Sequence, residues 1–113
     1  MLTRDHSYAQ VLADAGDIPQ AEVATHRLRN VLLRHVGGGG ARVDICHLEL
    51  RSGDQLLLCT DGLTDMVAEP GIAQILQSAA TAQAACDQLV SEALSAGGKD
   101  NITVVLARYS WQP

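Results

Sequence analysis

The sequence predicts a mixed α+β fold with a largely antiparallel sheet and flanking helices. Apolar residues at helical spacing occur in the first 28 residues and again between residues 69 and 98. Short apolar runs typical of strands lie between residues 29 and 59, and a final β-branched run covers 101–109. This order of helices, strands, helices and strand favours an antiparallel sheet, because a parallel sheet needs strands and helices that alternate.

The composition limits the core and the classes of partner. The 113 residues fit one domain, and 47% of them are apolar, but only 3% are aromatic and none is Phe. A core must therefore consist of Leu, Val, Ile and Ala. With 8 basic and 13 acidic residues, the net charge is -5 and the basic residues do not cluster. This balance argues against binding to nucleic acid or to an anionic membrane.

The cysteines and the hydropathy indicate the compartment. The three cysteines are an odd number without CxxC spacing, which favours a reduced, cytoplasmic protein. Two of them lie in apolar runs, where a thiol acts as a small apolar group. No apolar run approaches the roughly 20 residues that span a bilayer. The first ten residues lack the apolar centre of a signal peptide.

The N-terminal segment is expected to form two short helices. The first covers residues 5–16, where Asp5 or Ser7 can cap the start. The second covers residues 17–26, with Asp17 as its cap. We expect a helical hairpin with much polar surface.

Three strands are expected in the middle of the chain. Residues 29–36 form a short strand that ends at the four glycines 37–40. Residues 42–50 alternate between apolar and polar, as in a half-buried strand. Residues 55–59 are continuously apolar, which predicts a strand buried on both faces. The turn at 51–54 joins the last two strands as a hairpin.

Two helices and a strand are expected in the C-terminal part. The helices cover residues 69–79 and 81–98, and a Gly-Gly pair ends the second. The strand covers residues 101–109, where β-branched residues prevail. An apolar stripe follows one face of the second helix, formed by Ala82, Ala85, Cys86, Leu89, Val90, Ala93 and Leu94.

The motifs "TDG" and "KDN" are the candidate chemistry. Asp61 ends one predicted strand and Asp100 precedes another, so the sheet could bring the two carboxylates together. Gly62 allows a sharp turn and the close approach of a ligand. Paired carboxylates suit a hard divalent cation such as Mg²⁺ or Mn²⁺. The same residue types are also common in turns and loops without any metal, so residue type alone leaves both interpretations open.

An ordered set of motifs adds a family resemblance. "GDQLLLCTDGLTDMV" is followed by "GGKDNITVVLARY", and "LTRDHSYAQVLADAGDIPQAEVATHRLRNVLLRHVG" precedes both. Together they resemble the bacterial metal-dependent serine/threonine protein phosphatases of the PPM or type 2C family. The upstream segment is similar to the family pattern from "LTxDHS" to "HPxRNVLTRALG". Four motifs in this order at ordinary spacings make a chance match improbable.

The resemblance implies a fold, a reaction and a cofactor. The fold is a β-sandwich with flanking helices, of which this chain is the C-terminal part. A binuclear Mn²⁺ or Mg²⁺ centre activates a water that hydrolyses phosphoserine and phosphothreonine in proteins, and no phosphoenzyme forms. Asp61 and Asp100 match two metal-ligand aspartates of the family. No further residue of the chain is assigned a catalytic role.

Supporting roles follow for four neighbours of these motifs. Gly62 supplies backbone geometry, Asn101 fixes the loop beside Asp100, and Asp65 is expected to cap the next helical turn rather than to bind metal directly. Asp5, within the "DHS" motif, is expected to cap a helix. The four histidines lack metal-ligand spacing and are interpreted as surface or structural groups.

The resemblance also fixes the expected domain organisation. Residues 1–113 form one partial PPM domain, in which residues 7–28 are a flap beside the active site and residues 29–113 are the sheet and helices of the C-terminal half. The family's early motifs "DGHGG" and "GDSR" are absent, and with them the carboxylate that bridges both metals and the arginine that contacts phosphate. Two smaller departures are "RHVGGGG" for "RALG" and "CTDG" for "CSDG", the latter retaining a hydroxyl.

The missing motifs leave two functions to weigh. The first is a serine/threonine phosphatase, here as a truncated chain with little activity alone. The second is a noncatalytic phosphatase-like module that self-associates or docks on a partner through its uncovered sheet. Uptake of more than one Mn²⁺ per chain would favour the first function, and weak uptake of one ion or none would favour the second.

Overall fold

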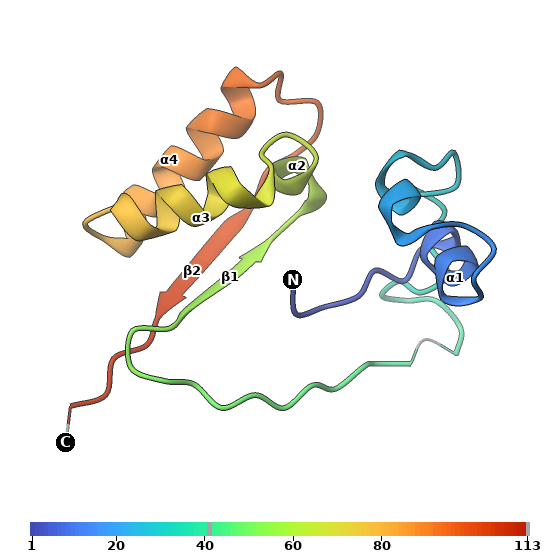
Figure 1. Ribbon diagram of the computed structural model, residues 1–113, viewed down its shortest axis with the longest axis horizontal. Helices are drawn as coiled ribbons and strands as arrows, with labels where there is room; N and C mark the ends of the chain where they lie inside the picture. Colours follow the sequence, from blue (N-terminus) through green and yellow to red (C-terminus); the bar gives the residue numbers. More distant parts are fainter. Residues whose placement is uncertain (41, 113) are drawn as a thin grey trace. The chain divides into compact units, whose positions relative to one another are not determined.

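The computed structural model describes residues 1–40 and 42–112, which form a small antiparallel sheet with helices (Figure 1). This α+β arrangement agrees with the predicted class. The elements in chain order are α1 (Tyr8–Asp14), the 3₁₀ helix η1 (Gln20–Thr25), β1 (Gln55–Cys59), α2 (Asp61–Thr64), α3 (Glu69–Ser78), α4 (Ala82–Ser95) and β2 (Val104–Arg108).

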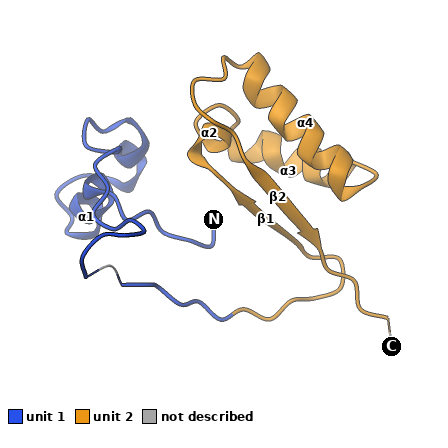
Figure 2. Cartoon of the chain, turned by 180° about the vertical axis from the view of Figure 1, so that it is seen from behind, with its two compact units in different colours: residues 1–47 blue, residues 48–113 orange. Residues whose placement is uncertain are grey.

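The chain divides into two compact units (Figure 2). Unit 1 comprises residues 1–47 and contains α1 and η1. Unit 2 comprises residues 48–113 and contains both strands and the three remaining helices. All strands of the described chain therefore lie in unit 2.

Unit 1 begins with the capped helix α1. The side chain of Ser7 accepts a hydrogen bond from the backbone N–H of Gln10 at 3.2 Å, which satisfies a free donor of the first turn. Ser7 is therefore the cap, and the role expected for Asp5 was wrong. The second predicted helix is only the 3₁₀ helix η1. Its N-cap is Pro19, without a side-chain hydrogen bond, so the capping role expected for Asp17 was also wrong.

The strand predicted at residues 29–36 does not form. The only bridge there joins Ser7 to Leu32 and is isolated, with hydrogen bonds from Tyr8 N to Val31 O (2.8 Å) and from Leu33 N to His6 O (2.8 Å). A strand needs a continuous row of such bonds, and the residues preceding α1 offer only these few partners. The segment therefore passes beside the start of α1 as an irregular chain.

Unit 2 is organised by the pairing of β1 with β2. The two strands are antiparallel, and their register pairs Gln55 with Arg108 and Cys59 with Val104. β1 has the predicted bounds, because turn residues lie on both sides of its apolar run. β2 is shorter than the predicted 101–109, because residues 101–103 bond to the segment beyond the end of β1.

The hairpin predicted from residues 42–50 and 55–59 is wrong. Residues 42–50 form no strand, and Val43 and Ile45 are 85% and 78% exposed. Their alternation fits a half-buried strand, but no described segment supplies a partner for the ladder. The partner of 55–59 is instead the distant strand β2.

The apolar core of unit 2 lies between the helices and one face of the sheet. α3 and α4 confirm the two predicted helices, and Gly98, with φ of +51°, ends α4 by donating its N–H to the carbonyl of Ala93 at 3.0 Å. Leu63 and Leu89 are completely buried. The buried cluster consists of Leu63, Ile72, Ile75, Ala85, Leu89 and Ala93, with Leu57, Val104 and Leu106 of the sheet packed against it.

The other face of the sheet is apolar and exposed. Leu58 and Val105 are partners in the register and are 63% and 57% exposed. The prediction that 55–59 is buried on both faces was therefore wrong, since the described helices cover one face only. Cys59, which lies in the apolar run of β1, is exposed, as is Cys46, and all three cysteines are free. Burial raises the pKa of the Cys59 thiol nonetheless.

Arg108 connects the end of β2 to the end of α3. Its guanidinium donates to the carbonyls of Ala79 (2.7 Å), Ala80 (3.0 Å) and Leu76 (3.4 Å), and to Oε1 of Gln55 (2.9 Å). A cation near the last carbonyls of a helix satisfies free acceptors and complements the helix dipole. Arg108 thereby fixes the C-terminus of α3 to the sheet.

A polar cluster joins separate segments of unit 1. Oδ2 of Asp44 lies 2.6 Å from Nε2 of His6, and Oδ1 accepts from Nη1 of Arg34 at 2.9 Å. The hydrogen bond to His6 and then that to Arg34 lower the pKa of Asp44. Nη1 of Arg34 also donates to the carbonyl of Arg42 at 3.3 Å. These bonds attach the extended segment around residue 44 to the start of the chain.

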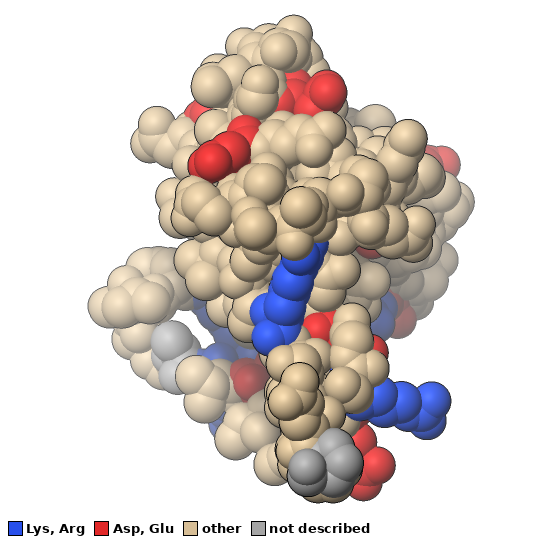
Figure 3. Space-filling model, turned by 90° about the vertical axis from the view of Figure 1, so that its left-hand side faces the viewer, with Lys and Arg blue, Asp and Glu red and all other residues tan. Residues whose placement is uncertain are grey.

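The helices of the described residues are short, and α4 is the longest of them with 14 residues. None of the helices there combines the length and the apolar character that crossing a bilayer requires. On the face shown in Figure 3, residues other than Lys, Arg, Asp and Glu form most of the surface, and Lys and Arg side chains occupy a small part of it.

Arg108→Met is expected to destabilise unit 2 by about 1 kcal/mol, because the last carbonyls of α3 exchange a charged donor for water. Urea denaturation followed by circular dichroism measures the change. Arg51→Met is the matched control, because Arg51 is an exposed residue of the turn before β1. Equal stability of the two variants would contradict the capping role of Arg108.

The carboxyl group of Asp44 is expected to titrate below its ordinary pKa of 3.8. Because its pKa is lowered in the folded state, the cluster stabilises unit 1 above that value, and this contribution disappears as the pH falls through the folded pKa. A carbon-13 NMR titration of the carboxyl group measures the midpoint.

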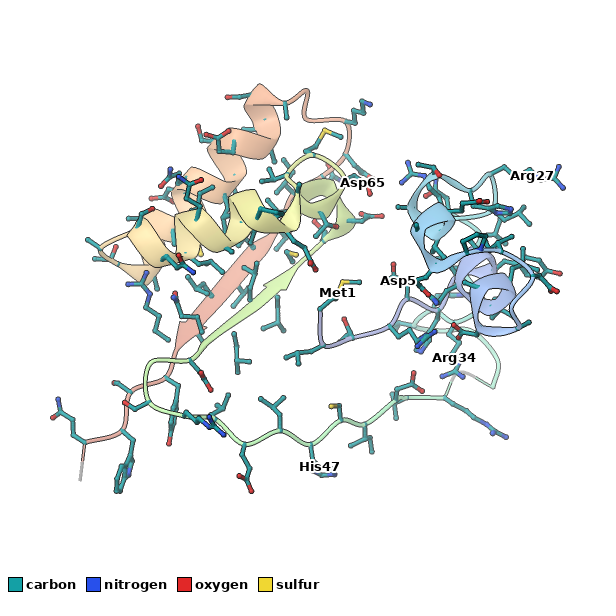
Figure 4. The ribbon with its side chains drawn as sticks, in the orientation of Figure 1. Met1, Asp5, Arg27, Arg34, His47 and Asp65 are labelled. Atoms are coloured by element: carbon teal, nitrogen blue, oxygen red, sulfur yellow. The ribbon has the colours of Figure 1, made fainter. Side chains whose placement is uncertain are left out.

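Arg34→Met should raise that midpoint, and Arg27→Met should leave it unchanged. Arg27 projects from a different part of unit 1 than Arg34 (Figure 4). A midpoint for Asp44 at or above 3.8 in the unmodified chain would refute the role of the cluster.

Candidate metal site

Two short segments meet at one end of the sheet. Because the strands are antiparallel and the ladder ends at the pair of Cys59 and Val104, the residues after β1 lie beside the residues before β2. Asp61 follows β1 by two positions, and Asp100 precedes β2 by four. The fold therefore places both predicted aspartates at the same end of the sheet.

Asp61 is the first residue of the one-turn helix α2. Its carbonyl accepts a hydrogen bond from the N–H of Asp65 at 2.8 Å, and its side chain lies at the exposed surface. The motif is thus a strand followed by a helical turn rather than by a tight turn. A helix that begins at Asp61 still allows the carboxylate of Asp61 to lie beyond the end of β1.

Asp65 ends the same helix. It is the C-cap residue of α2 and lies at the edge of that turn (Figure 4). The N-cap of the following helix α3 is Ala68, so the expectation that Asp65 caps the next helix was wrong. The helix α3 has Pro70 in its first turn, where the missing N–H is not needed.

Thr60 connects the two segments by three hydrogen bonds. Its N–H donates to the carbonyl of Thr103 at 3.1 Å, and its hydroxyl accepts from the N–H of Thr103 at 3.0 Å. The same hydroxyl donates to the carbonyl of Asn101 at 3.1 Å. The residue immediately before Asp61 is therefore bound to the loop that contains Asp100.

Gly62 is needed because the two segments approach closely. A Cβ atom on Gly62 would lie 2.2 Å from the carbonyl oxygen of Asn101 and 2.9 Å from its carbonyl carbon. These are main-chain atoms that cannot rotate away. The glycine is therefore required by space, and its backbone is that of an ordinary helix.

Asp100 and Asn101 shape the opposite loop. Oδ1 of Asp100 accepts the N–H of Asn101 at 2.7 Å, and the carbonyl of Asn101 accepts the hydroxyl of Thr60. Asn101 therefore supports the loop through its main chain. Both carboxylates lie at the exposed surface, as a group that is to meet a solvated ion must.

The available donors fit one hard cation only in part. Two aspartates at one end of a sheet offer the oxygen ligands that Mg²⁺ and Mn²⁺ prefer, but such ions take about six ligands. Within residues 1–40 and 42–112, no three His, Cys, Asp or Glu side chains gather closely enough to hold a metal. Water would have to fill the other positions, so we expect weak binding.

Comparison with known proteins identifies the family of the chain. The family model described as Stage II sporulation protein E (SpoIIE) matches residues 5–110. The serine/threonine phosphatase stp of Listeria monocytogenes serotype 4b (strain F2365) is 42% identical over 106 residues, which cover 93% of this chain and 42% of the relative. The serine/threonine protein phosphatase PstP of Mycobacterium tuberculosis (strain H37Rv) is 38% identical over 106 residues, covering 94% and 20%.

Solved structures agree with the sequence relatives. The crystal structure of the serine/threonine phosphatase PstP/Ppp of Mycobacterium tuberculosis matches with a TM-score of 0.88 at 34% identity, covering 97% of this chain and 46% of that one. Stp1 of Staphylococcus aureus matches with a TM-score of 0.87 at 35% identity, covering 97% and 44%. The catalytic domain of PstP in complex with two manganese ions matches with a TM-score of 0.75 at 35% sequence identity. The match covers 93% of this chain and 43% of that one.

The relatives are bacterial serine/threonine phosphatases, the class that the motif resemblance implied. The chain belongs to this family of metal-dependent protein phosphatases, the PPM or type 2C family, through the match of residues 5–110. It spans less than half the length of the relatives it matches.

The sequence motifs indicate the two aspartates as candidates but do not indicate what connects their segments. The only signal for Thr60 was a hydroxyl where the family more often has serine, and nothing indicated a bond to Asn101. Gly62 was interpreted as a turn residue, whereas its role in the structure is to leave space. The assignment of Asp61 and Asp100 as ligands stays a prediction.

Gly62→Ala is expected to destabilise unit 2 by about 2 kcal/mol, because the added methyl group would overlap main-chain atoms of Asn101. Chemical denaturation measures the loss. Gly71→Ala is the matched control, since Gly71 is also helical and its added methyl group would lie 3.3 Å from the side chain of Val67 only. We expect it to be neutral or slightly stabilising. Similar losses in both variants would contradict the close approach at Gly62.

Proposed function

We propose that this chain is the C-terminal part of a PPM serine/threonine protein phosphatase and supplies two of its metal ligands, Asp61 and Asp100. The substrates of the complete enzyme are phosphoserine and phosphothreonine residues of proteins, in the reducing cytoplasm that three free cysteines suit. Alone, the chain has little phosphatase activity. The observation that supports this proposal is the meeting of the "TDG" and "KDN" segments at one end of the sheet.

The chemistry of the family explains why two carboxylates matter. When bound, a pair of Mn²⁺ or Mg²⁺ ions lowers the pKa of a water nucleophile and offsets the charge of the phosphoryl oxygens. The role of this chain is to present negatively charged oxygens at a fixed separation. Thr60 and Gly62 support that role by holding the two loops together.

The proposed complete fold is the β-sandwich of the family. In this proposal residues 1–113 belong to one partial domain, in which residues 7–28 form a flap beside the active site and residues 29–113 form the C-terminal half of the sandwich. The exposed apolar face with Leu58 and Val105 supports this proposal, because it is suited to packing against a second sheet.

One observation favours a second function. The exposed Leu58 and Val105 lie side by side in the register, and an apolar sheet face of this kind can bind another protein. In the described residues, no group of three or more His, Cys, Asp or Glu side chains could hold a metal ion. A noncatalytic module that self-associates through this face is the alternative.

Manganese titration of the purified chain tests the assignment of Asp61 and Asp100 as ligands, which a truncated enzyme with a partial site would meet by binding one ion rather than two. We expect one Mn²⁺ per chain, bound weakly with a Kd of roughly 0.1 to 1 mM because few protein ligands are present. Asp61→Asn and Asp100→Asn should each remove this binding. Asp87→Asn is the matched control, because Asp87 is an exposed aspartate of α4 that accepts a hydrogen bond from Gln83. Isothermal titration calorimetry measures all four proteins.

The outcomes separate the two functions. Binding that survives both Asp61→Asn and Asp100→Asn would refute the ligand assignment. Rapid metal-dependent hydrolysis of a phosphopeptide, lost in Asp61→Asn, would refute the expected lack of activity. No Mn²⁺ uptake together with a dimer in sedimentation that Leu58→Thr dissociates would support the noncatalytic module instead.

A further inference from the structure

The hydroxyl of Thr60 accepts a hydrogen bond that a main-chain carbonyl would accept in a continued strand ladder. In an antiparallel ladder continued by one pair, Thr60 and Thr103 would exchange two hydrogen bonds between their main chains. One of these exists, from Thr60 N to Thr103 O at 3.1 Å. The carbonyl of Thr60, however, accepts the N–H of Leu63 at 3.1 Å and starts α2. The N–H of Thr103 therefore binds the hydroxyl of Thr60 instead, at 3.0 Å.

This exchange lets β1 turn into a helix without separating from β2. The carbonyl of Thr60 serves the helix, and its side chain serves the sheet. The hydroxyl has one proton to donate, and it donates that proton to Asn101 O at 3.1 Å. Both capacities of the hydroxyl are thus used on the segment that follows Asp100.

The contacts continue from Thr60 to both aspartates. Asp61 is covalently next to Thr60. On the other side, the carbonyl of Asn101 is held by Thr60 and lies over Gly62, and the N–H of Asn101 holds Oδ1 of Asp100 at 2.7 Å. One hydroxyl therefore links the main chain next to the first carboxylate to the main chain that carries the second.

We propose that Thr60 is a positioning residue of the two-aspartate site, and that its hydroxyl sets the separation between Asp61 and Asp100. This inference rests on the proposed function of the two aspartates. In this role Thr60 is not a metal ligand, and its hydroxyl accepts from the N–H of Thr103 and donates to the carbonyl of Asn101. Thr60 is exposed, so water can satisfy those groups if the hydroxyl is removed. Its loss should change the geometry of the site more than the stability of the fold.

Three variants separate the hydroxyl from the shape of the side chain. Thr60→Val keeps the branched shape and removes the hydroxyl, and Thr60→Ser keeps the hydroxyl. Thr64→Val is the matched control, because the hydroxyl of Thr64 bonds within α2 to the carbonyl of Asp61 at 3.5 Å. We expect Thr60→Val to weaken Mn²⁺ binding about tenfold, as loss of residues that orient metal ligands does. Thr60→Ser should bind Mn²⁺ with an affinity within about twofold of that of the unmodified chain, and Thr64→Val should leave the affinity unchanged.

A measurement without metal tests the same inference independently. In NMR spectra of the full chain, Thr60→Val should speed hydrogen exchange at the N–H of Thr103 and shift the carboxyl carbon of Asp100, and Thr60→Ser should reverse both changes. A melting temperature for each variant separates these local effects from global unfolding.

The outcomes distinguish this inference from the proposed function. If Mn²⁺ binding does not depend on Asp61 and Asp100, the ligand assignment fails, while the NMR signals of Thr103 and Asp100 still decide the role of Thr60. If binding depends on both aspartates but Thr60→Val binds as the unmodified chain does, the positioning role is overturned. Unchanged signals of Asp100 in Thr60→Val would overturn it as well.

Discussion

The antiparallel pairing of β1 with β2 is the interaction on which unit 2 depends. It joins Gln55 to Arg108, which are 53 residues apart, and so closes a loop that contains α2, α3 and α4. The helices of this loop pack on one face of the sheet, and Leu63 and Leu89 are completely buried between the layers. The ladder ends at the pair of Cys59 and Val104. The segment that follows β1 and the segment that precedes β2 must therefore lie side by side at that end of the sheet.

The arrangement of the candidate metal site follows from the main chain more than from the side chains that give it chemistry. A glycine allows one segment to lie directly against the carbonyl of Asn101, and a threonine hydroxyl replaces a ladder bond where the strand becomes a helix. Neither residue carries charge. These neutral neighbours bring together the main chains that carry the two aspartates, although the like charges of the two carboxylates repel each other.

The sequence predicted what is encoded within a segment. α3 and α4 follow from their helical periodicity, and β1 follows from an apolar run between turns. The segment 42–50 alternates between apolar and polar residues as a strand does, but it forms no strand. A strand needs a pairing partner, and the residues of one segment do not determine which other segment pairs with it. The nearness of Asp61 and Asp100 could be anticipated from strand order. The bond between Thr60 and Asn101 could not, because it joins a hydroxyl to a main-chain atom 41 residues away.

The long separation between the paired strands has a consequence for the order of folding. The helices α3 and α4 rest on contacts between near neighbours, whereas β1 has no strand partner among the described residues until 104–108 have been synthesised. During translation the apolar side of β1 is therefore open for as long as the ribosome needs to make residues 60–103, about 2 to 9 seconds at ordinary elongation rates, and that of α4 is open for a shorter time. In that interval the nascent chain presents Leu57 and Leu89 to solvent, so a chaperone that binds short apolar segments would find its binding sites there.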